Sequence, residues 1–220
     1  MTGLSVSAVT IERGERPLFA PLTFNTDAGA LVRVTGENGA GKTTLLRALA
    51  GLTSVASGSI QWLSAPSAHY IGAKRVFIGH SNAMNDSLSP YENLAFASGV
   101  AGKSVTRAEV RAALARTGVA ALIDRRVGSL SQGQKKRVAL ARLFLPGNET
   151  AAWLLDEPFV ALDVATQALL AGHIEATLAE GRIVVLTSHQ RVDIRATNAI
   201  EVTLSAIKAP ERLVANEVQA

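Results

Sequence analysis

The sequence predicts an α/β fold in which a mostly parallel sheet is interrupted by a helical insertion. Short apolar runs of the kind found here are typical of strands whose two faces are both covered by other elements. These runs span 75–80, 151–156 and 182–188. Between the first two runs, helix start signals follow one another with no strand pattern between them. We therefore expect a core built from 1–80 and 151–220, with 81–150 as a helical subdomain.

The core is predicted to begin with two strands and a helix. LSVSAVTIE, near the N-terminus, alternates apolar and polar residues like a half-buried strand. LVRVTG, from Leu31, reads as a second strand and runs directly into a glycine-rich turn. KTTLLRALA, from Lys42 to Ala50, has helical spacing and is followed by Gly51 as a stop signal. The order is therefore strand, loop and helix.

Three capping patterns predict the helices of the subdomain. In each, a Ser or Thr at the N-cap is followed three residues later by a Glu or Gln that can complete a capping box. The pairs are Ser89 with Glu92, Thr106 with Glu109, and Ser131 with Gln134. Pro90 also stands at a favoured first helical position. The second helix can close at Gly118, and we expect the third to run through Leu145.

The composition excludes several classes of protein. Of the 220 residues, 48% are hydrophobic and 18% are charged, and the charged share lies below the roughly 25% of an average soluble protein. A disordered chain and a coiled coil are therefore excluded. Without cysteine, a disulfide framework, a thiolate metal site and a cysteine nucleophile are excluded as well.

The sequence indicates a cytosolic chain. Its first dozen residues lack the basic and then apolar pattern of a signal peptide. The longest uncharged stretch, 48–73, is broken by Gly, Ser, Pro, Gln and His, so no membrane span is expected. The net charge of +4 could suggest a nucleic-acid partner. Because the densest basic cluster, Lys135 to Arg137, lies on a predicted helix, we interpret it as a solvated face and expect no nucleic-acid partner.

The segment from Gly36 to Thr43 fits the phosphate-binding-loop pattern in full, between a strand and a helix as the pattern requires. Backbone N–H groups must turn inward around an anion, and side chains at the glycine positions would obstruct them. Lys42 supplies a cation for the outer phosphates, Thr43 a hydroxyl for Mg²⁺, and Thr44 a hydroxyl near the inner phosphate. The predicted nucleotide-binding residues are Gly36, Glu37, Asn38, Gly39, Ala40, Gly41, Lys42, Thr43 and Thr44. Such a loop alone also fits kinases and GTPases.

A second candidate site is the apolar strand WLLDE, which ends in two acidic residues. Open α/β sheets bind ligands at the carboxyl ends of their strands. Asp156 can hold Mg²⁺, directly or through water. Adjacent strand residues point to opposite sides, so Glu157 can have a separate task. We predict that Glu157 is the general base for a water molecule, a role that contributes roughly 10² to 10⁴ in rate.

The segment LSQGQ, which includes Ser131 to Gln134, predicts a second anion site. It combines a Ser cap, a Gly that allows close approach and the exposed N–H groups of a helix start. No phosphate-binding loop lies beside it in the sequence. The presence of this segment distinguishes between the protein families that share a phosphate-binding loop.

These motifs closely resemble the ATP-binding-cassette family over most of the chain. The phosphate-binding loop, LSQGQ, WLLDE, the loop from Val160 to Asp163 and Thr187-Ser188-His189 stand in the family's order. The resemblance implies a P-loop NTPase core of the RecA-like type with an N-terminal antiparallel β region. It also implies an ATPase that uses ATP and Mg²⁺.

The resemblance further implies a head-to-tail dimer of two copies of the chain. Each ATP would lie between the phosphate-binding loop of one copy and the signature segment of the other. The implied contacts across the dimer are Ser131, Gln132, Gly133 and Gln134. His189 would be the switch histidine that touches the γ-phosphate, and Asp163 would link the two sites.

The sequence departs from the family at three positions. His80 stands where most cassettes have a Gln that contacts Mg²⁺ or the attacking water. Because Mg²⁺ prefers oxygen, we expect His80 to bond the water rather than the metal; an ordinary loop histidine is the alternative. Cassettes usually stack an aromatic residue on adenine, but 11–14 has none, so Arg13 is the stacking candidate and a solvated Arg the alternative. Gln132 replaces a more common Gly, which we interpret as tolerated variation.

Several stretches resemble more specifically the ATP-binding subunits of the haem exporters of cytochrome c biogenesis. They are Ile78-Gly79-His80, Glu92-Asn93-Leu94, Trp153 to Phe159 with Ala161-Leu162-Asp163, and Ser188-His189-Gln190. The resemblance implies a peripheral protein on the cytoplasmic face of the bacterial inner membrane. It would bind integral membrane permease subunits and small haem-handling membrane subunits. We expect docking near His80 and the inserted helices, where exposed Leu88, Tyr91 or Phe96 would mark a groove.

Two other functions remain open, and two further classes are disfavoured by the sequence. A cassette for another substrate is the main alternative, because the membrane subunits select the substrate. Hydrolysis could also release a haem-loaded chaperone instead of exporting haem. A cassette that acts on ribosomes or DNA would usually carry two ATPase halves or a long coiled-coil insertion. A metabolic phosphotransferase would have no use for LSQGQ.

Overall fold

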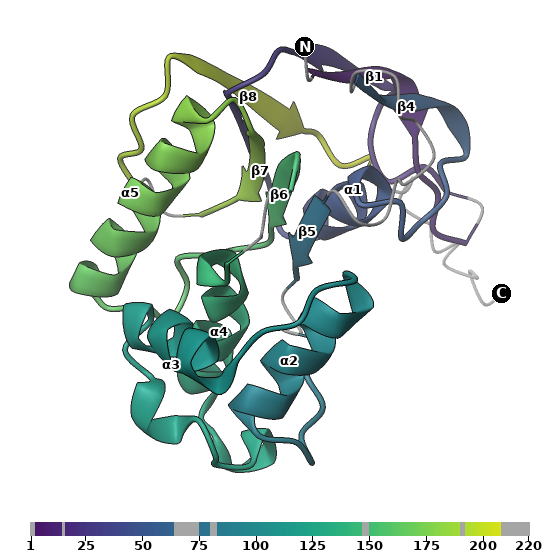
Figure 1. Ribbon diagram of the computed structural model, residues 1–220. Coiled ribbons are helices and arrows are strands. Elements are labelled where there is room, and N and C mark those ends of the chain that lie inside the picture. Colours follow the sequence, from purple (N-terminus) through teal and green to yellow (C-terminus); the bar gives the residue numbers. More distant parts are fainter. Residues whose placement is uncertain are drawn as a thin grey trace, which may run out of the picture.

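The computed structural model describes residues 3–14, 16–63, 75–79, 83–146, 150–189 and 192–207. Two sheets lie above a lobe of helices in the view of Figure 1. The smaller sheet is antiparallel, with strand order β2-β1-β4. Its strands are β1 (Gly3–Thr10), β2 (Leu22–Thr26) and β4 (Ser57–Leu63).

The larger sheet is parallel throughout and has the order β5-β6-β7-β3-β8. Its strands are β3 (Ala30–Gly36), β5 (Arg75–Ile78), β6 (Ala152–Leu155), β7 (Ile183–Thr187) and β8 (Asn198–Leu204). Every residue of β6 and β7 is buried, as expected for strands that are covered on both faces. Because parallel strands end at the same edge, the loops that follow β3, β6 and β7 converge there.

Two helices cover the larger sheet. Helix α1 (Lys42–Leu49) lies between the sheets and contributes Leu45, Leu46 and Leu49 to the core that they share. Helix α5 (Val164–Ala179) covers the other face, where a second core surrounds Trp153 and Ile174. In Figure 1, α5 stands at the left of the larger sheet and α1 at its right.

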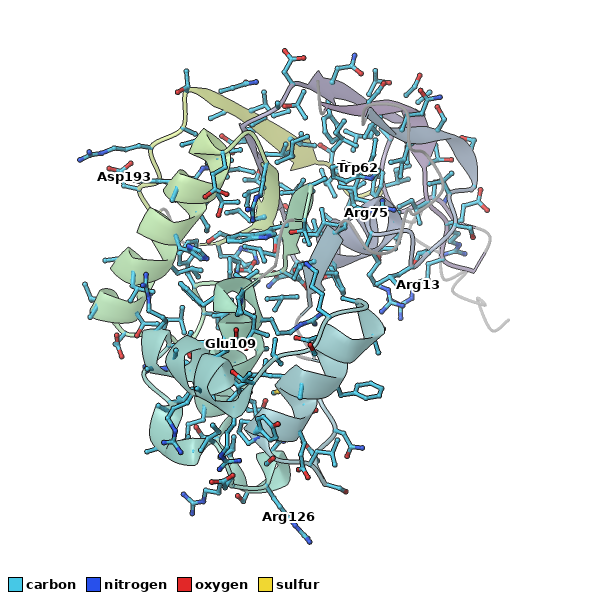
Figure 2. The ribbon with its side chains drawn as sticks, in the orientation of Figure 1. Arg13, Trp62, Arg75, Glu109, Arg126 and Asp193 are labelled. Carbon is cyan, nitrogen blue, oxygen red and sulfur yellow. The ribbon has the colours of Figure 1, made fainter. Side chains whose placement is uncertain are left out.

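The helical lobe has a core of its own. It contains α2 (Pro90–Val100), α3 (Arg107–Arg116) and α4 (Gln132–Ala141), together with short 3₁₀ turns at Ala120–Leu122, Val127–Ser129 and Arg142–Phe144. All three helices begin with the capping boxes predicted from the sequence. The lobe lies at the bottom of Figure 1, and Figure 2 places Glu109 and Arg126 on it.

The third helix is shorter than predicted. Helix α4 ends at Ala141, and the chain tightens into a 3₁₀ turn before Leu145. The Leu145 N–H donates to the carbonyl of Arg142, three residues earlier. Bonds of this kind commonly tighten the last turn of a helix. The predicted α/β fold class, with its parallel sheet, antiparallel N-terminal region and inserted helices, is confirmed.

Within the described ranges, no helix is long and apolar enough to cross a membrane.

Candidate active site

The phosphate-binding loop connects β3 to α1. Gly36, Gly39 and Gly41 all have positive φ, with values of 138°, 83° and 96°. A Cβ at Gly36 would lie 2.5 Å from the carbonyl oxygen of Leu204, and one at Gly41 would lie 3.0 Å from the ring of Phe19. A Cβ at Gly39 would meet nothing within 4 Å. Gly36 and Gly41 are therefore required by close contacts within the protein. This reason adds to the one predicted from the sequence, which is access for an anion.

Lys42 lies within the curve of this loop and is only 9% exposed. Its Nζ donates to the carbonyl oxygens of Gly36 (2.7 Å) and Glu37 (3.0 Å). These bonds hold the ammonium group beside the loop. When a nucleotide binds there, its phosphate oxygens would replace the carbonyl oxygens as the partners of Lys42.

Asp156 follows β6 and is almost fully buried. Its Oδ2 accepts a hydrogen bond from Thr43 Oγ1, and its Oδ1 accepts one from Thr187 Oγ1, both at 2.8 Å. Its backbone N–H donates to the carbonyl of Ile78 on the neighbouring strand. A threonine hydroxyl and a carboxylate thus meet at the carboxyl edge of the sheet.

This oxygen donor set fits Mg²⁺. Mg²⁺ binds one or two protein carboxylates and completes its octahedron with water and substrate phosphates. The described part of the chain contains no group of three or more His, Asp and Glu residues that could hold a metal by themselves.

Glu157 has a carboxylate oxygen without a hydrogen-bond partner. Its side chain is 14% exposed, and its Oε1 is buried and accepts no hydrogen bond. His189 lies beside it: the His189 backbone N–H donates to Oε2 at 3.3 Å, and His189 Nε2 lies 3.5 Å from Oε1. The Glu157 carboxylate thus has one oxygen with unused acceptor capacity, and the residue lines the cavity described next.

Most of the predicted nucleotide-binding and catalytic residues meet in a cavity of about 470 Å³, a size in the usual range for ligand sites. Gly36, Glu37 and Ala40 belong to the loop but do not line the cavity. Its lining combines the phosphate-binding loop, both acidic residues after β6 and the histidine after β7. The lining residues are Arg13, Leu18, Asn38, Gly39, Gly41, Lys42, Thr43, Thr44, Asp156, Glu157, Val160 and His189. Arg13 is exposed at the rim, and Leu18 adds an apolar surface that the sequence does not predict. Figure 2 shows Arg13 on the side of Trp62 and Arg75, away from Asp193.

The signature segment lies outside this cavity. Ser131 caps α4: its Oγ accepts from the Gln134 N–H at 3.2 Å, and the Gln134 Oε1 accepts from the Ser131 N–H at 2.9 Å. Ser131 and Gln132 are exposed, and Gly133 is half-buried. None of the four residues Ser131 to Gln134 lines the cavity. The capped start of α4 is thus open to a ligand that this chain does not itself hold.

Asp163 caps α5 and also contacts α4. Its Oδ1 accepts from the Thr166 N–H at 2.8 Å, and its Oδ2 pairs with Arg137 Nη2 at 2.6 Å. The hydrogen bonds from the Thr166 backbone and hydroxyl, followed by Arg137, lower the pKa of Asp163 from 3.8 to about 2. The loop after β6 is therefore tied to the signature helix within one chain.

Thr187 and Lys136 both bond to Asp156, and neither bond is predicted from the sequence. Thr187 stands in a quoted motif, but its bond to Asp156 follows only from the pairing of strands. The solvated-face interpretation of the basic cluster is wrong for Lys136, which is buried and donates to the carbonyl of Asp156 at 2.9 Å. Packing of α4 against the end of β6 buries this side chain. No local signal in the sequence marks this burial.

Two further predictions concern the surface. His80 lies outside the described residues. Phe96 is 70% exposed on α2, whereas Leu88 and Tyr91 are half-buried.

A family model described as ABC transporter matches residues 19–160. The chain belongs to the ABC transporter family. The match includes the phosphate-binding loop, LSQGQ and both acidic residues after β6.

Curated ABC relatives share a more specific name. The "Cytochrome c biogenesis ATP-binding export protein CcmA" of Albidiferax ferrireducens is 43% identical over 199 residues, which are 89% of this chain and 94% of the relative. The protein of the same name from Aromatoleum aromaticum is 44% identical over 181 residues, 81% of this chain and 84% of the relative.

Solved ABC structures share the fold. A putative ABC transporter ATP-binding protein from Pyrococcus furiosus superposes with a TM-score of 0.74 at 24% identity, over 91% of this chain and 97% of that one. A dimeric ATP-binding cassette in a post-hydrolysis state, bound to ADP and Pi, has a TM-score of 0.72 at 21% identity, over 85% and 88%. At this identity the likeness concerns the fold.

Proposed function

We propose that this chain is the ATP-hydrolysing subunit of an ABC transporter that serves cytochrome c biogenesis. One arrangement supports the ATPase assignment most strongly. The Thr43 hydroxyl, the Asp156 carboxylate and the Glu157 carboxylate meet at the cavity that the phosphate-binding loop lines. The name shared by its curated relatives supports the pathway.

Nucleotide binding begins with the loop between β3 and α1. Lys42 exchanges its bonds to the Gly36 and Glu37 carbonyls for the outer phosphates, while the N–H groups at the start of α1 receive phosphate oxygens. The sugar and base extend towards the rim. There the Arg13 guanidinium stacks on the base, and Leu18 supplies an apolar surface.

Thr43 and Asp156 are the residues that would hold Mg²⁺. Their oxygens already lie 2.8 Å apart, and Thr187 fixes the other carboxylate oxygen. When bound, Mg²⁺ neutralises charge on the phosphates and polarises the bond to the leaving ADP. The protein supplies the orientation of this pair.

Glu157 acts on the attacking water. Its carboxylate accepts the water proton as the water oxygen bonds to the γ-phosphorus and the bond from that phosphorus to the bridging oxygen breaks. ADP leaves with the electron pair of the broken bond. His189, whose ring lies 3.5 Å from Oε1, orients the γ-phosphate and the glutamate.

Two copies complete each other's sites. The start of α4 carries a Ser cap, the exposed Gln132 and a helix N-terminus. It lies outside the cavity in which the same chain would bind the phosphates of ATP. In a head-to-tail dimer, Ser131 to Gln134 of one copy would meet the ATP on the other, and Asp163 would join the two sites.

The membrane partners dock on the helical lobe. Phe96 and Val100 stand four residues apart on α2 and are 70% and 75% exposed, so they form an apolar strip on one helix face. We assign this strip to integral membrane permease subunits at the cytoplasmic face of the inner membrane. The cargo is haem, exported or released with a chaperone, and small haem-handling subunits complete the assembly.

Co-purification from detergent tests this assignment. The tagged chain would be expressed in its host, extracted with the membranes and analysed by mass spectrometry and absorption spectroscopy. Haem and small haem-handling subunits that travel with the chain support the proposal. An amino-acid or metal permease in their place would establish a transporter for another substrate.

A further inference from the structure

Three consecutive basic residues of α4 contact two loops: the loop before α2, and both ends of the loop between β6 and α5. Lys135 pairs with Asp86 at 2.7 Å, Lys136 donates to the Asp156 carbonyl at 2.9 Å, and Arg137 pairs with Asp163 at 2.6 Å. Successive helical residues point about 100° apart, so one short segment can reach three directions. Of the three, Lys136 contacts the segment that carries the proposed catalytic residues.

The Lys136 ammonium group is buried at that contact. The residue is 7% exposed, and burial lowers its pKa, while the charges of Asp156 and Glu157 oppose that effect. Burying a cation is costly unless it is paired and hydrogen-bonded. Its bond to the Asp156 carbonyl and the nearby charges of Asp156 and Glu157 offset part of that cost.

The peptide group between Asp156 and Glu157 is held from both sides. Its carbonyl accepts from Lys136 Nζ, and its N–H donates to Thr187 Oγ1 at 2.9 Å. Glu157 has a φ of +48°, in the left-handed region that a residue with a Cβ seldom adopts. A conformation of this kind persists only where its surroundings hold it.

We infer that Lys136 is a positioning residue for ATP hydrolysis: with Thr187, it clamps the Asp156–Glu157 peptide in the orientation that directs the Glu157 carboxylate into the nucleotide cavity. This inference rests on the proposed ATPase function. It also connects the two sites of the dimer, since Lys136 and Ser131 lie on the same helix segment. A shift of α4 as Ser131 meets one ATP would move the clamp on the glutamate that acts on the other.

Steady-state ATPase kinetics of substituted full-length protein test the clamp. Lys136→Met removes the donor and keeps an unbranched side chain of similar length. Lys136→Arg keeps a cationic donor. Lys135→Met is the matched control, because it makes the same substitution one residue earlier, at a half-buried lysine that pairs with the exposed Asp86, away from the Asp156–Glu157 peptide. Circular dichroism and thermal unfolding establish that each variant is folded.

We expect Lys136→Met to lower kcat about tenfold, as the loss of one charge-assisted hydrogen bond would, and to change the Kd for ATP less than twofold. Lys136→Arg should recover most of the lost kcat, and Lys135→Met should match the parent chain. A kcat of Lys136→Met within twofold of the parent overturns the inference. So does a parallel loss of ATP affinity, or an equal loss in Lys136→Arg.

A second measurement is independent of activity. A crystal structure of Lys136→Met should show Glu157 released to a negative φ, with its carboxylate turned from the cavity. A retained φ near +48° would overturn the clamp while the proposed ATPase function stands. If the parent chain hydrolyses no ATP, or Glu157→Gln turns over normally, the proposed function fails, and the inference fails with it.

Discussion

Thr43 Oγ1 donates a 2.8 Å hydrogen bond to Asp156 Oδ2, although 113 residues separate the two in the chain. The first begins α1 and the second follows β6, and the parallel order of β3, β7 and β6 brings the two segments to one edge of the sheet. This contact joins the phosphate-binding loop to the acidic pair, and the proposed chemistry depends on it.

Asp156→Asn should weaken the binding of the Mg²⁺ that hydrolysis requires. An amide keeps one oxygen for the threonine hydroxyls but loses the negative charge that attracts the cation. We expect the Mg²⁺ concentration for half-maximal ATPase activity to rise about tenfold or more. Asp193→Asn, at an exposed aspartate outside the 470 Å³ cavity, is the control. An unaltered Mg²⁺ titration would exclude Asp156 as a metal ligand.

Glu157→Gln should bind ATP and accumulate as a closed dimer. Glutamine cannot take the proton of the attacking water, so turnover should fall by roughly 10² to 10⁴, while the phosphate-binding loop is untouched. Light scattering with and without ATP measures the dimer, and phosphate release measures turnover. Glu180→Gln, in a surface pair with Arg182, is the control. Parent-like turnover of Glu157→Gln would exclude this residue as the base.

His173 should make the protein less stable as the pH falls below 6.5. Its ring stacks on Phe144 and lies near Trp153, and its Nε2 contacts the carbonyl of Leu143 at 2.9 Å. Burial is the largest cause that lowers its pKa below 6.5. Between pH 6.5 and the lower pKa of the folded state, the unfolded chain binds a proton at His173 and the folded chain does not. The free energy of unfolding therefore decreases as the pH falls through this range.

Thermal and urea unfolding between pH 8 and pH 5.5 measure this effect. Each pH unit in the window should cost up to about 1.4 kcal/mol of unfolding free energy, and His173→Gln should remove that part of the slope. The other three histidines stay in both proteins and serve as an internal control. Identical slopes for the two would contradict the prediction.

Phe96→Ser should weaken the association with membrane subunits. Because the ring is 70% exposed, its removal should change the unfolding free energy by less than about 0.5 kcal/mol. The yield of permease co-purified with the chain, and the stimulation of ATPase activity by the permease, are the measurements. Leu52→Ser, at a 56% exposed residue after α1, is a matched control outside the helical lobe. Equal yields for both variants would exclude α2 as the docking helix.

Much of the site could be predicted from the sequence because its parts are local. The glycine-rich loop lies between adjacent elements, and each of the three helices of the lobe begins with its own capping box. Strands β2, β4 and β8 were not individually predicted. All three pair at an edge of their sheets, and their described residues are mostly exposed or half-buried, so their apolar patterns are weak.

The sequence by itself determined which chemical groups are present and where α1 to α4 and the anion-binding loop begin, since backbone N–H geometry and capping involve residues three or four positions apart. Helix α5 was not predicted. Only the tertiary structure decided that Thr43 meets Asp156, that Thr187 and Lys136 hold one peptide group, and that Lys136 is buried rather than solvated. The reason is physical: desolvation and hydrogen bonding across a fold depend on which distant segments cover a side chain, and local spacing carries no record of that.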